Sequence, residues 1–229
     1  MNGKLYIKGK TAGDFAYMDR SDITAVHLKE GICRIGDMAF CRCSSLKSVH
    51  LPKSLDVVGI NAFVGTNITT LNIPDNVVFI DSKAFAFNHK LRSVRIGKNV
   101  EFIMPGAFAG CPMLKEITVD PENLYYYVDN GCLIEKKTKK LIAATYPYKI
   151  PEGVEIIDRQ IFLFLTNCNT VTLPSSVKAI YMHEGEVGNF YMCKEIANAG
   201  GTVTIKAPKD SYAEKFARKH EINFEEDKE

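Results

Sequence analysis

A single motif recurs through the first half of the chain at a nearly constant spacing. Between Ile23 and Met113 it occurs four times, in copies of 23, 22, 23 and 23 residues. Five apolar columns coincide when the copies are aligned. A fixed period of this length is typical of a solenoid, in which each copy forms one coil stacked on the previous coil. An Ala-Phe pair closes each copy, at Ala39-Phe40, Ala62-Phe63, Ala84-Phe85 and Ala107-Phe108.

The opening segment of each copy has the alternation of a short strand. In the first copy, Ile23, Val26 and Leu28 are the apolar positions that point inward, and the residues between them point outward. One isolated coil buries too little apolar surface to offset the entropy lost on ordering its backbone. We therefore expect parallel strands from successive coils to pair, with the Phe ring of each pair filling the far side of its coil. The predicted class is a β-dominated α/β solenoid of short parallel strands.

The period predicts one solenoid domain over residues 1–229, with both ends closed by modified coils. KLYIKG is expected to form a first strand in which Leu5 aligns with Leu28, 23 residues later. Ser211 and Glu214 form a capping box ahead of a helix, YAEKFARKH. The expected parts are an N-terminal cap (1–22), four regular repeats (23–113), a repeat with a hairpin insert (114–149), degenerate repeats (150–201) and a C-terminal cap (202–229).

Two further segments depart from the repeat near the C-terminus. EVGNFYMCKEIANAGG has no Ala-Phe pair in register and predicts a short helix that ends at Gly200 and Gly201. Residues 225–229 are expected to be a frayed tail.

The insert combines hairpin signals with a concentration of tyrosines. Asp129-Asn130-Gly131 is a turn signal, and CLIEKKTKKLIAAT predicts two short strands around a lysine-rich turn. Tyrosine is favoured at recognition surfaces, but tyrosines also fasten hairpins to their supports. Both roles are open for Tyr125, Tyr126 and Tyr127, and for Tyr146 and Tyr148.

Two histidines occupy the same outward position of adjacent predicted strands. His27 and His50 should place their rings about 5 Å apart. The pair could bind a metal, form a solvated polar ladder or contact a partner, and the row supplies no third ligand for a metal. Lys47, Arg92 and Lys115 make this face mildly basic, which would suit an acidic partner. The row is continued by Asn72, Arg95 and Thr118.

The cysteines give a weak metal signal and a stronger structural one. Cys41 and Cys43 could be half of a zinc site, but no second pair follows at zinc spacing. Cys43, Thr66, Asn88 and Cys111 share one repeat column, where a small side chain can bond the backbone of a turn. No phosphate loop, pair of catalytic carboxylates or hydrolase elbow occurs in a workable context. We expect no enzymatic activity and no cofactor.

The repeat resembles that of a known family. The pattern L-x-x-I-x-L-P, V-x-x-I-G, A-F-x-x-C occurs here as LKSVHLPKSLDVVGINAF and LRSVRIGKNVEFIMPGAFAGC, which resembles the BspA-type leucine-rich repeats. The tail IKAPKDSYAEKFARKHEINFEE is similar to a closing segment often found in that family. The resemblance implies a bacterial leucine-rich-repeat fold and a role in molecular recognition, and it implies no chemistry.

Composition bears mainly on partners and compartment. A net charge of +2 over 229 residues gives no reason to expect nucleic acid, and no apolar run is long enough for a membrane span. The start MNGKLYIKGK lacks the apolar core of a secretion signal, and seven cysteines fit a reducing compartment. These features favour the cytoplasm, whereas the family resemblance favours the cell surface or secretion.

The sequence thus predicts a recognition module that is not an enzyme and is a monomer. It would bind a protein or glycan through the strand face, the tyrosine-rich insert or both. The alternative is a structural or spacer unit of a larger surface protein, without a ligand of its own. The candidate contact residues are His27, His50, Asn72, Arg95, Tyr125, Tyr126 and Tyr127.

Overall fold

The computed structural model describes residues 3–158, 170–181 and 204–228. Contacts between residues divide the chain into two compact units, Met1–Tyr126 and Tyr127–Glu229. Each unit has its own buried apolar side chains.

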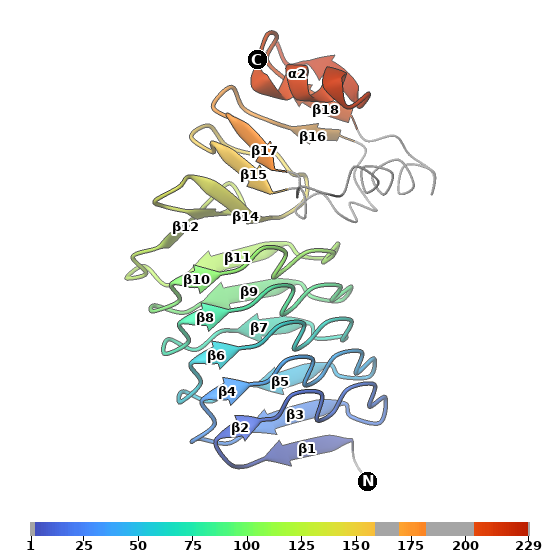
Figure 1. Cartoon of the computed structure of the whole chain (residues 1–229), viewed down its shortest axis with the longest axis vertical. Coiled ribbons are helices and arrows are strands. Elements are labelled where there is room, and N and C mark those ends of the chain that lie inside the picture. The colour runs from blue at the N-terminus through green and yellow to red at the C-terminus, as the bar shows by residue number, and fades with distance from the viewer. Residues whose placement is uncertain (1–2, 159–169, 182–203, 229) are drawn as a thin grey trace. The chain divides into compact units, whose positions relative to one another are not determined.

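The first unit consists of coils that contribute strands to parallel sheets, as the repeat predicts (Figure 1). One sheet contains β1 (Lys4–Ile7), β3 (Ala25–Leu28) and β5 (Ser48–His50). A second contains β7 (Thr70–Asn72), β9 (Ser93–Ile96) and β11 (Glu116–Val119). Two-residue strands form a third sheet, from β2 (Thr11–Ala12), β4 (Arg34–Ile35), β6 (Val57–Val58), β8 (Phe79–Ile80) and β10 (Phe102–Ile103).

The longer strands do not form one continuous sheet, because the ladder is interrupted between β5 and β7. The interruption coincides with the 22-residue copy. Its missing residue falls between Thr66 and Ile68, where the other copies have two residues between the buried turn position and the first buried strand position. The approach to β7 is therefore one residue shorter than the others. The two-residue strands β6 and β8 remain paired across the same boundary.

The first strand is present, but its predicted register is wrong. β1 pairs with β3 so that Ile7 lies opposite Leu28 and Leu5 lies opposite Val26, in place of the expected pairing of Leu5 with Leu28. Ala12 still lies opposite Ile35, 23 residues later. The first coil is therefore shorter between its two strands by two residues, which the apolar pattern alone did not reveal.

The Ala-Phe pairs form the interior column that the repeat predicts. Successive rings lie parallel, with centroids 5.0 Å apart for Phe40 and Phe63, 5.4 Å for Phe63 and Phe85, and 5.8 Å for Phe85 and Phe108. Tyr17 adds a fifth ring, 5.2 Å from Phe40. The expected single file is confirmed, and the alanine beside each of the four phenylalanine rings is almost completely buried.

The backbone around each pair alternates its hydrogen bonds between coils. The Phe40 amide donates to the Ala62 carbonyl of the next coil (2.8 Å), and the Phe63 amide donates to Ala84 (2.7 Å). The amides between them close tight turns within their own coil, such as Ala62 to Gly59 (3.3 Å). Such turns need left-handed residues at fixed places. Residues with positive φ occur in two columns of the repeat. The first column is Phe15, Met38, Asn61, Lys83 and Gly106, and the second is Asp19, Arg42, Gly65, Phe87 and Gly110.

A carboxylate clamp joins coils on the opposite side of the Ala-Phe column. Glu30 accepts hydrogen bonds from the amides of Lys53 (3.0 Å) and Ser54 (3.1 Å) in the next coil. The Ser54 hydroxyl accepts from the Gly31 amide and donates to the Ile32 carbonyl. The same arrangement recurs in the second unit, where Glu152 accepts from Ser175 and Ser176.

The second unit begins with the predicted hairpin. β12 (Tyr126–Asp129), β13 (Cys132–Glu135), β14 (Lys140–Ala144), β15 (Ile156–Asp158) and β17 (Ala179–Tyr181) form one sheet in that order. β13 and β14 pair antiparallel around the lysine-rich turn, which confirms the predicted hairpin. Asn130 and Gly131 have positive φ values of 48° and 72°, as a tight turn before β13 requires. β14 then pairs parallel with β15, so the coil arrangement resumes.

The C-terminal segment contains the predicted helix and an unexpected strand. α2 (Tyr212–Lys219) has Ser211 as its N-cap, and the Glu214 amide donates to the Ser211 hydroxyl (3.2 Å). The prediction of a frayed tail is wrong for Glu225 and Glu226, because β19 (Asn223–Glu226) pairs in parallel with β18 (Thr204–Ala207). β16 (Thr170–Thr172) completes this sheet on the other side of β18. The helix predicted before Gly200, together with Cys168 and Cys193, lies outside the described residues.

The ring column predicts a large effect of removing a central ring. Phe63→Ala or Phe85→Ala should each lower the free energy of unfolding by roughly 3 to 5 kcal/mol, because each removes a buried side chain whose neighbours can collapse only partly. Urea unfolding measures the loss. Phe102→Ala is the matched control, since Phe102 is 47% exposed while Phe63 is 0% exposed. A loss below about 1 kcal/mol for Phe63→Ala would contradict the conclusion that the ring column is buried and stabilises the fold.

The clamp predicts a contribution to stability that depends on pH. The amides of Lys53 and Ser54 hold the pKa of Glu30 below its usual value of 4.5, with the larger effect from Lys53. A lowered folded-state pKa gives stability that is present above the unfolded value and is lost as pH falls through the folded value. Glu30→Gln should therefore reduce the stability lost between pH 7 and pH 3, measured by urea unfolding at each pH. Glu116→Gln is the exposed control, and an equal effect of both changes would contradict the clamp.

Candidate recognition surface

The N-terminal half of the strand face carries a row of three rings. Register places Tyr6 on β1 beside His27 on β3, and His27 beside His50 on β5. The Tyr6 and His27 rings are stacked with centroids 4.9 Å apart, and the His27 and His50 rings are 6.2 Å apart and tilted. The two predicted histidines are therefore neighbours. Sequence reasoning missed Tyr6, which is 55% exposed, because it assigned β1 the wrong register.

Four lysines surround this row without ion-pair partners. Lys4 lies on β1, Lys8 follows β1, Lys29 follows β3 and Lys47 precedes β5, and all four are exposed. The Lys29 ammonium lies 5.3 Å from the centre of the Tyr6 ring. None of the four belongs to an ion pair within the described part of the chain. We call Tyr6, His27, His50 and these lysines the basic ring row.

In the C-terminal half of the strand face the outward row centres on an arginine that is paired, whereas Arg92 and Lys115 beside it are exposed and belong to no ion pair among the described residues. Arg95 on β9 donates to Asp75 (3.0 and 3.1 Å) and to Asp120 (2.7 Å). Arg95 also approaches the Asn72 side chain at 3.5 Å, and the guanidinium holds the pKa of Asp75 below its usual range. Asn72 and Thr118 flank Arg95 in register, but the ladder break separates Asn72 from His50. The predicted row is therefore two shorter rows with different chemistry.

The three consecutive tyrosines of the insert have different environments. Tyr126 is only 2% exposed, and its hydroxyl accepts from the Ile103 amide (2.9 Å) and donates to the Glu101 carbonyl (3.1 Å). Tyr126 therefore forms hydrogen bonds with the outer edge of β10. The sequence suggested that its side chain could contact a partner, but the side chain is buried. Tyr125 is 36% exposed, and burial together with nearby Glu101 raises its pKa. The Lys139 ammonium lies over the Tyr127 ring, 5.7 Å from the ring centre.

The shared turn column of Cys43, Thr66, Asn88 and Cys111 has the structural role that the sequence favoured. Cys43 donates to the Tyr17 carbonyl (3.0 Å), and Cys111 donates to the Phe85 carbonyl (3.4 Å). Asn88 donates to the Phe63 and Phe85 carbonyls, and Thr66 bonds Asn88. Burial raises the pKa of the Cys43 thiol to about 11 and that of Cys111 to about 12, which opposes formation of a reactive thiolate.

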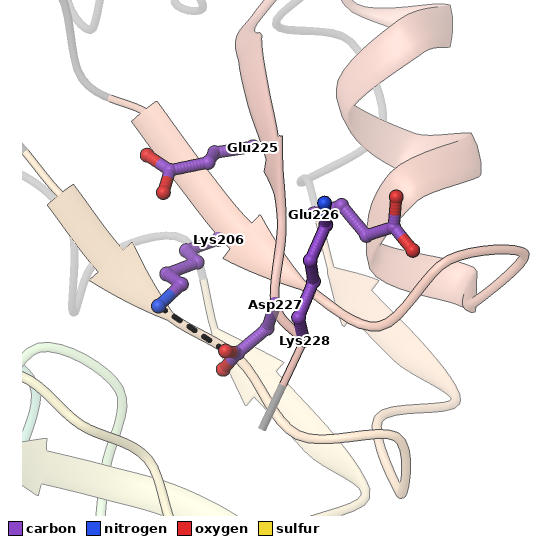
Figure 2. Close-up of a pocket in the computed structure, with 5 residues that line it drawn as sticks. All are labelled: Lys206, Glu225, Glu226, Asp227 and Lys228. Carbon is purple, nitrogen blue, oxygen red and sulfur yellow. Dashed lines mark ion pairs between the residues drawn. The ribbon is translucent and has the colours of Figure 1, made fainter.

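Metal ligands do not gather in the part of the chain that the structure describes, where no three side chains of His, Cys, Asp or Glu lie close enough to hold an ion. An open pocket in the second unit is lined by charged residues (Figure 2). Lys206 on β18 forms an ion pair with Asp227 at 3.2 Å, and the remaining lining residues are Glu225, Glu226 and Lys228. No nucleophile with an adjacent base lines this pocket, so it lacks the arrangement of an acyl-transfer or hydrolytic site.

Among the described residues, no helix has the length and apolar character needed to cross a bilayer.

Comparison with known proteins agrees with this architecture. The model of the BspA type leucine-rich repeat region matches residues 10–134 and 144–224, with six copies. No curated protein matches the chain. Proteins of this family and its structural neighbours are typically repeat proteins without enzymatic activity.

Two solved structures show the same fold. A leucine-rich repeat protein from Eubacterium ventriosum is 22% identical with a TM-score of 0.62, and the match covers 92% of this chain and 63% of that protein. The pneumococcal vaccine antigen PcpA is 17% identical with a TM-score of 0.52, and the match covers 77% of this chain and 52% of PcpA. The chain thus spans less than two thirds of either protein. With the family model matching most of its residues, the chain belongs to the BspA-type leucine-rich-repeat family.

Proposed function

We propose that the protein is a non-enzymatic recognition module that binds an acidic partner through the basic ring row. The observation that carries this proposal is the outward row of the N-terminal half, where stacked rings adjoin unpaired lysines, whereas the outward row of the other half centres on a paired arginine. The C-terminal half satisfies Arg95 with Asp75 and Asp120. The N-terminal half leaves four exposed lysines without carboxylate partners among the described residues.

The chemistry of the row supports a protein partner over a glycan. Tyr6 and His27 stack on each other at 4.9 Å, so the ring faces between them are not open to a sugar. Lysine ammonium groups, imidazole nitrogens and a phenol hydroxyl are point donors that suit carboxylates. Paired strands hold the backbone of Tyr6, His27 and His50, so little backbone freedom would be lost on binding. An Asp- and Glu-rich segment of another protein is therefore the preferred partner.

The alternative is a structural unit of a longer protein with no ligand of its own. The closed network around Arg95 would serve that role equally well, because it joins three coils. A spacer, however, has no use for an uncompensated cluster of lysines, which repel one another in the folded state.

Binding of charged peptides separates these functions. An extended peptide rich in Asp and Glu should bind the wild-type chain, and binding should weaken with added salt because the contacts are ionic. Lys8→Glu with Lys29→Glu should weaken binding by roughly tenfold or more, measured by fluorescence anisotropy.

The matched control is Lys83→Glu with Lys90→Glu, which changes the net charge equally at two exposed lysines away from the row. Equal weakening by both double variants would contradict a specific site. No binding of the acidic peptide would favour the spacer, and preferential binding of an acidic polysaccharide would make the partner a glycan.

A further inference from the structure

The sheet of two-residue strands exposes a second, apolar surface in the first unit. Its outward positions are occupied by Val57 on β6, Phe79 on β8 and Phe102 on β10, in register across three coils. The Phe79 and Phe102 rings lie 5.9 Å apart at 42°, and Phe102 is 47% exposed. Neither ring belongs to the buried column of Ala-Phe pairs, whose members lie inside the coils.

Other exposed apolar side chains adjoin this row. Ile60 follows β6 and is 40% exposed, and Met104 follows β10 and is 36% exposed. Tyr125, also 36% exposed, lies near Glu101, the residue that precedes Phe102. Exposed apolar residues are ordinary when scattered, but a contiguous set marks an interaction surface. The apolar side strip is made of Val57, Ile60, Phe79, Phe102, Met104 and Tyr125.

Carboxylates border the strip. Asp56 immediately precedes β6, Glu101 immediately precedes β10, and Asp81 immediately follows β8. Within the described residues, none of these three carboxylates belongs to an ion pair. The neighbouring cation, Arg34 on β4, is already held by Asp37 at 2.9 Å. The strip therefore combines an apolar centre with uncompensated negative charge at its margins.

We propose that the apolar side strip docks a segment of another protein in which apolar side chains alternate with lysines or arginines. The apolar side chains would cover Phe79 and Phe102, and the cations would meet Asp56, Asp81 and Glu101. Two copies of this chain facing each other through the strip would bring like charges together. An anionic membrane surface would be repelled for the same reason. Charge thus favours a basic protein segment over either of these occupants.

The test uses two synthetic amphipathic peptides and the full chain. One peptide carries leucines and lysines, and the other keeps the leucines but replaces every lysine by glutamate. The lysine peptide should bind and the glutamate peptide should not, as measured by fluorescence anisotropy. Phe102→Ser with Met104→Ser should weaken binding by roughly tenfold or more, because exposed aromatic and methionine side chains supply much of the energy at such surfaces. Asp56→Lys should also weaken binding.

Matched controls test whether the effect belongs to the strip. Phe15→Ser removes a phenylalanine that is 56% exposed on a turn of the first coil, and Glu116→Lys reverses an exposed charge on β11. Both variants should bind the lysine peptide as the wild type does, and circular dichroism should show all variants folded. The proposal is overturned if the two peptides bind equally, if Phe102→Ser with Met104→Ser has no effect, or if the lysine peptide fails to bind. Sedimentation as a dimer that Phe102→Ser disrupts would also overturn it, because the occupant would be a second copy.

Discussion

The hydrogen bond from each phenylalanine amide to the alanine carbonyl of the next coil is the interaction on which the fold depends. The donors Tyr17, Phe40, Phe63 and Phe85 reach their acceptors at 2.7 to 2.9 Å. The bond requires coils to approach within strand spacing, and the alanines that supply the acceptor carbonyls are almost completely buried. Once coils lie at this spacing, the rings stack, the short strands pair and the carboxylate of Glu30 reaches the following coil.

Stacking at this spacing has a direct consequence for the surface. Residues at equivalent positions of successive coils become neighbours. Where the same type of side chain recurs at one position of the repeat, these side chains form a row. The basic ring row, the network around Arg95 and the apolar side strip are three such rows in the first unit. Coils stacked in this way present side chains of one kind as extended rows, a form of surface typical of recognition by repeat proteins.

Much of this architecture could be predicted because the repeat encodes which side chains face inward. The buried columns, the ring file, the hairpin around residues 136–139 and the capped helix all follow from local pattern and turn chemistry. Lateral relationships could not be predicted in the same way. The register of β1, the interruption between β5 and β7, and the pairing of β19 depend on loop length and on which strand edges remain open.

The candidate site was predictable only in part, for a related reason. Pattern showed that His27, His50 and Arg95 face outward, but it could not show that Asp75 and Asp120 would neutralise Arg95. Tyrosine is a residue type that is common at contact surfaces, yet the Tyr126 hydroxyl forms hydrogen bonds with the backbone of Glu101 and Ile103. The apolar side strip was missed because each of its members occupies a short strand or its margin, where two residues give no measurable period.

Hydrogen exchange at the phenylalanine amides tests the central claim most directly. If these amides are bonded between coils, those of Phe40, Phe63 and Phe85 should be strongly protected in the native protein. Phe63→Ala should then accelerate exchange at Phe40, whose acceptor belongs to the altered coil, and at Phe85, whose ring has lost its neighbour. Exchange of the wild-type Phe40 and Phe85 amides at the rate of an unstructured peptide would contradict the account, as would protection that Phe63→Ala leaves unchanged.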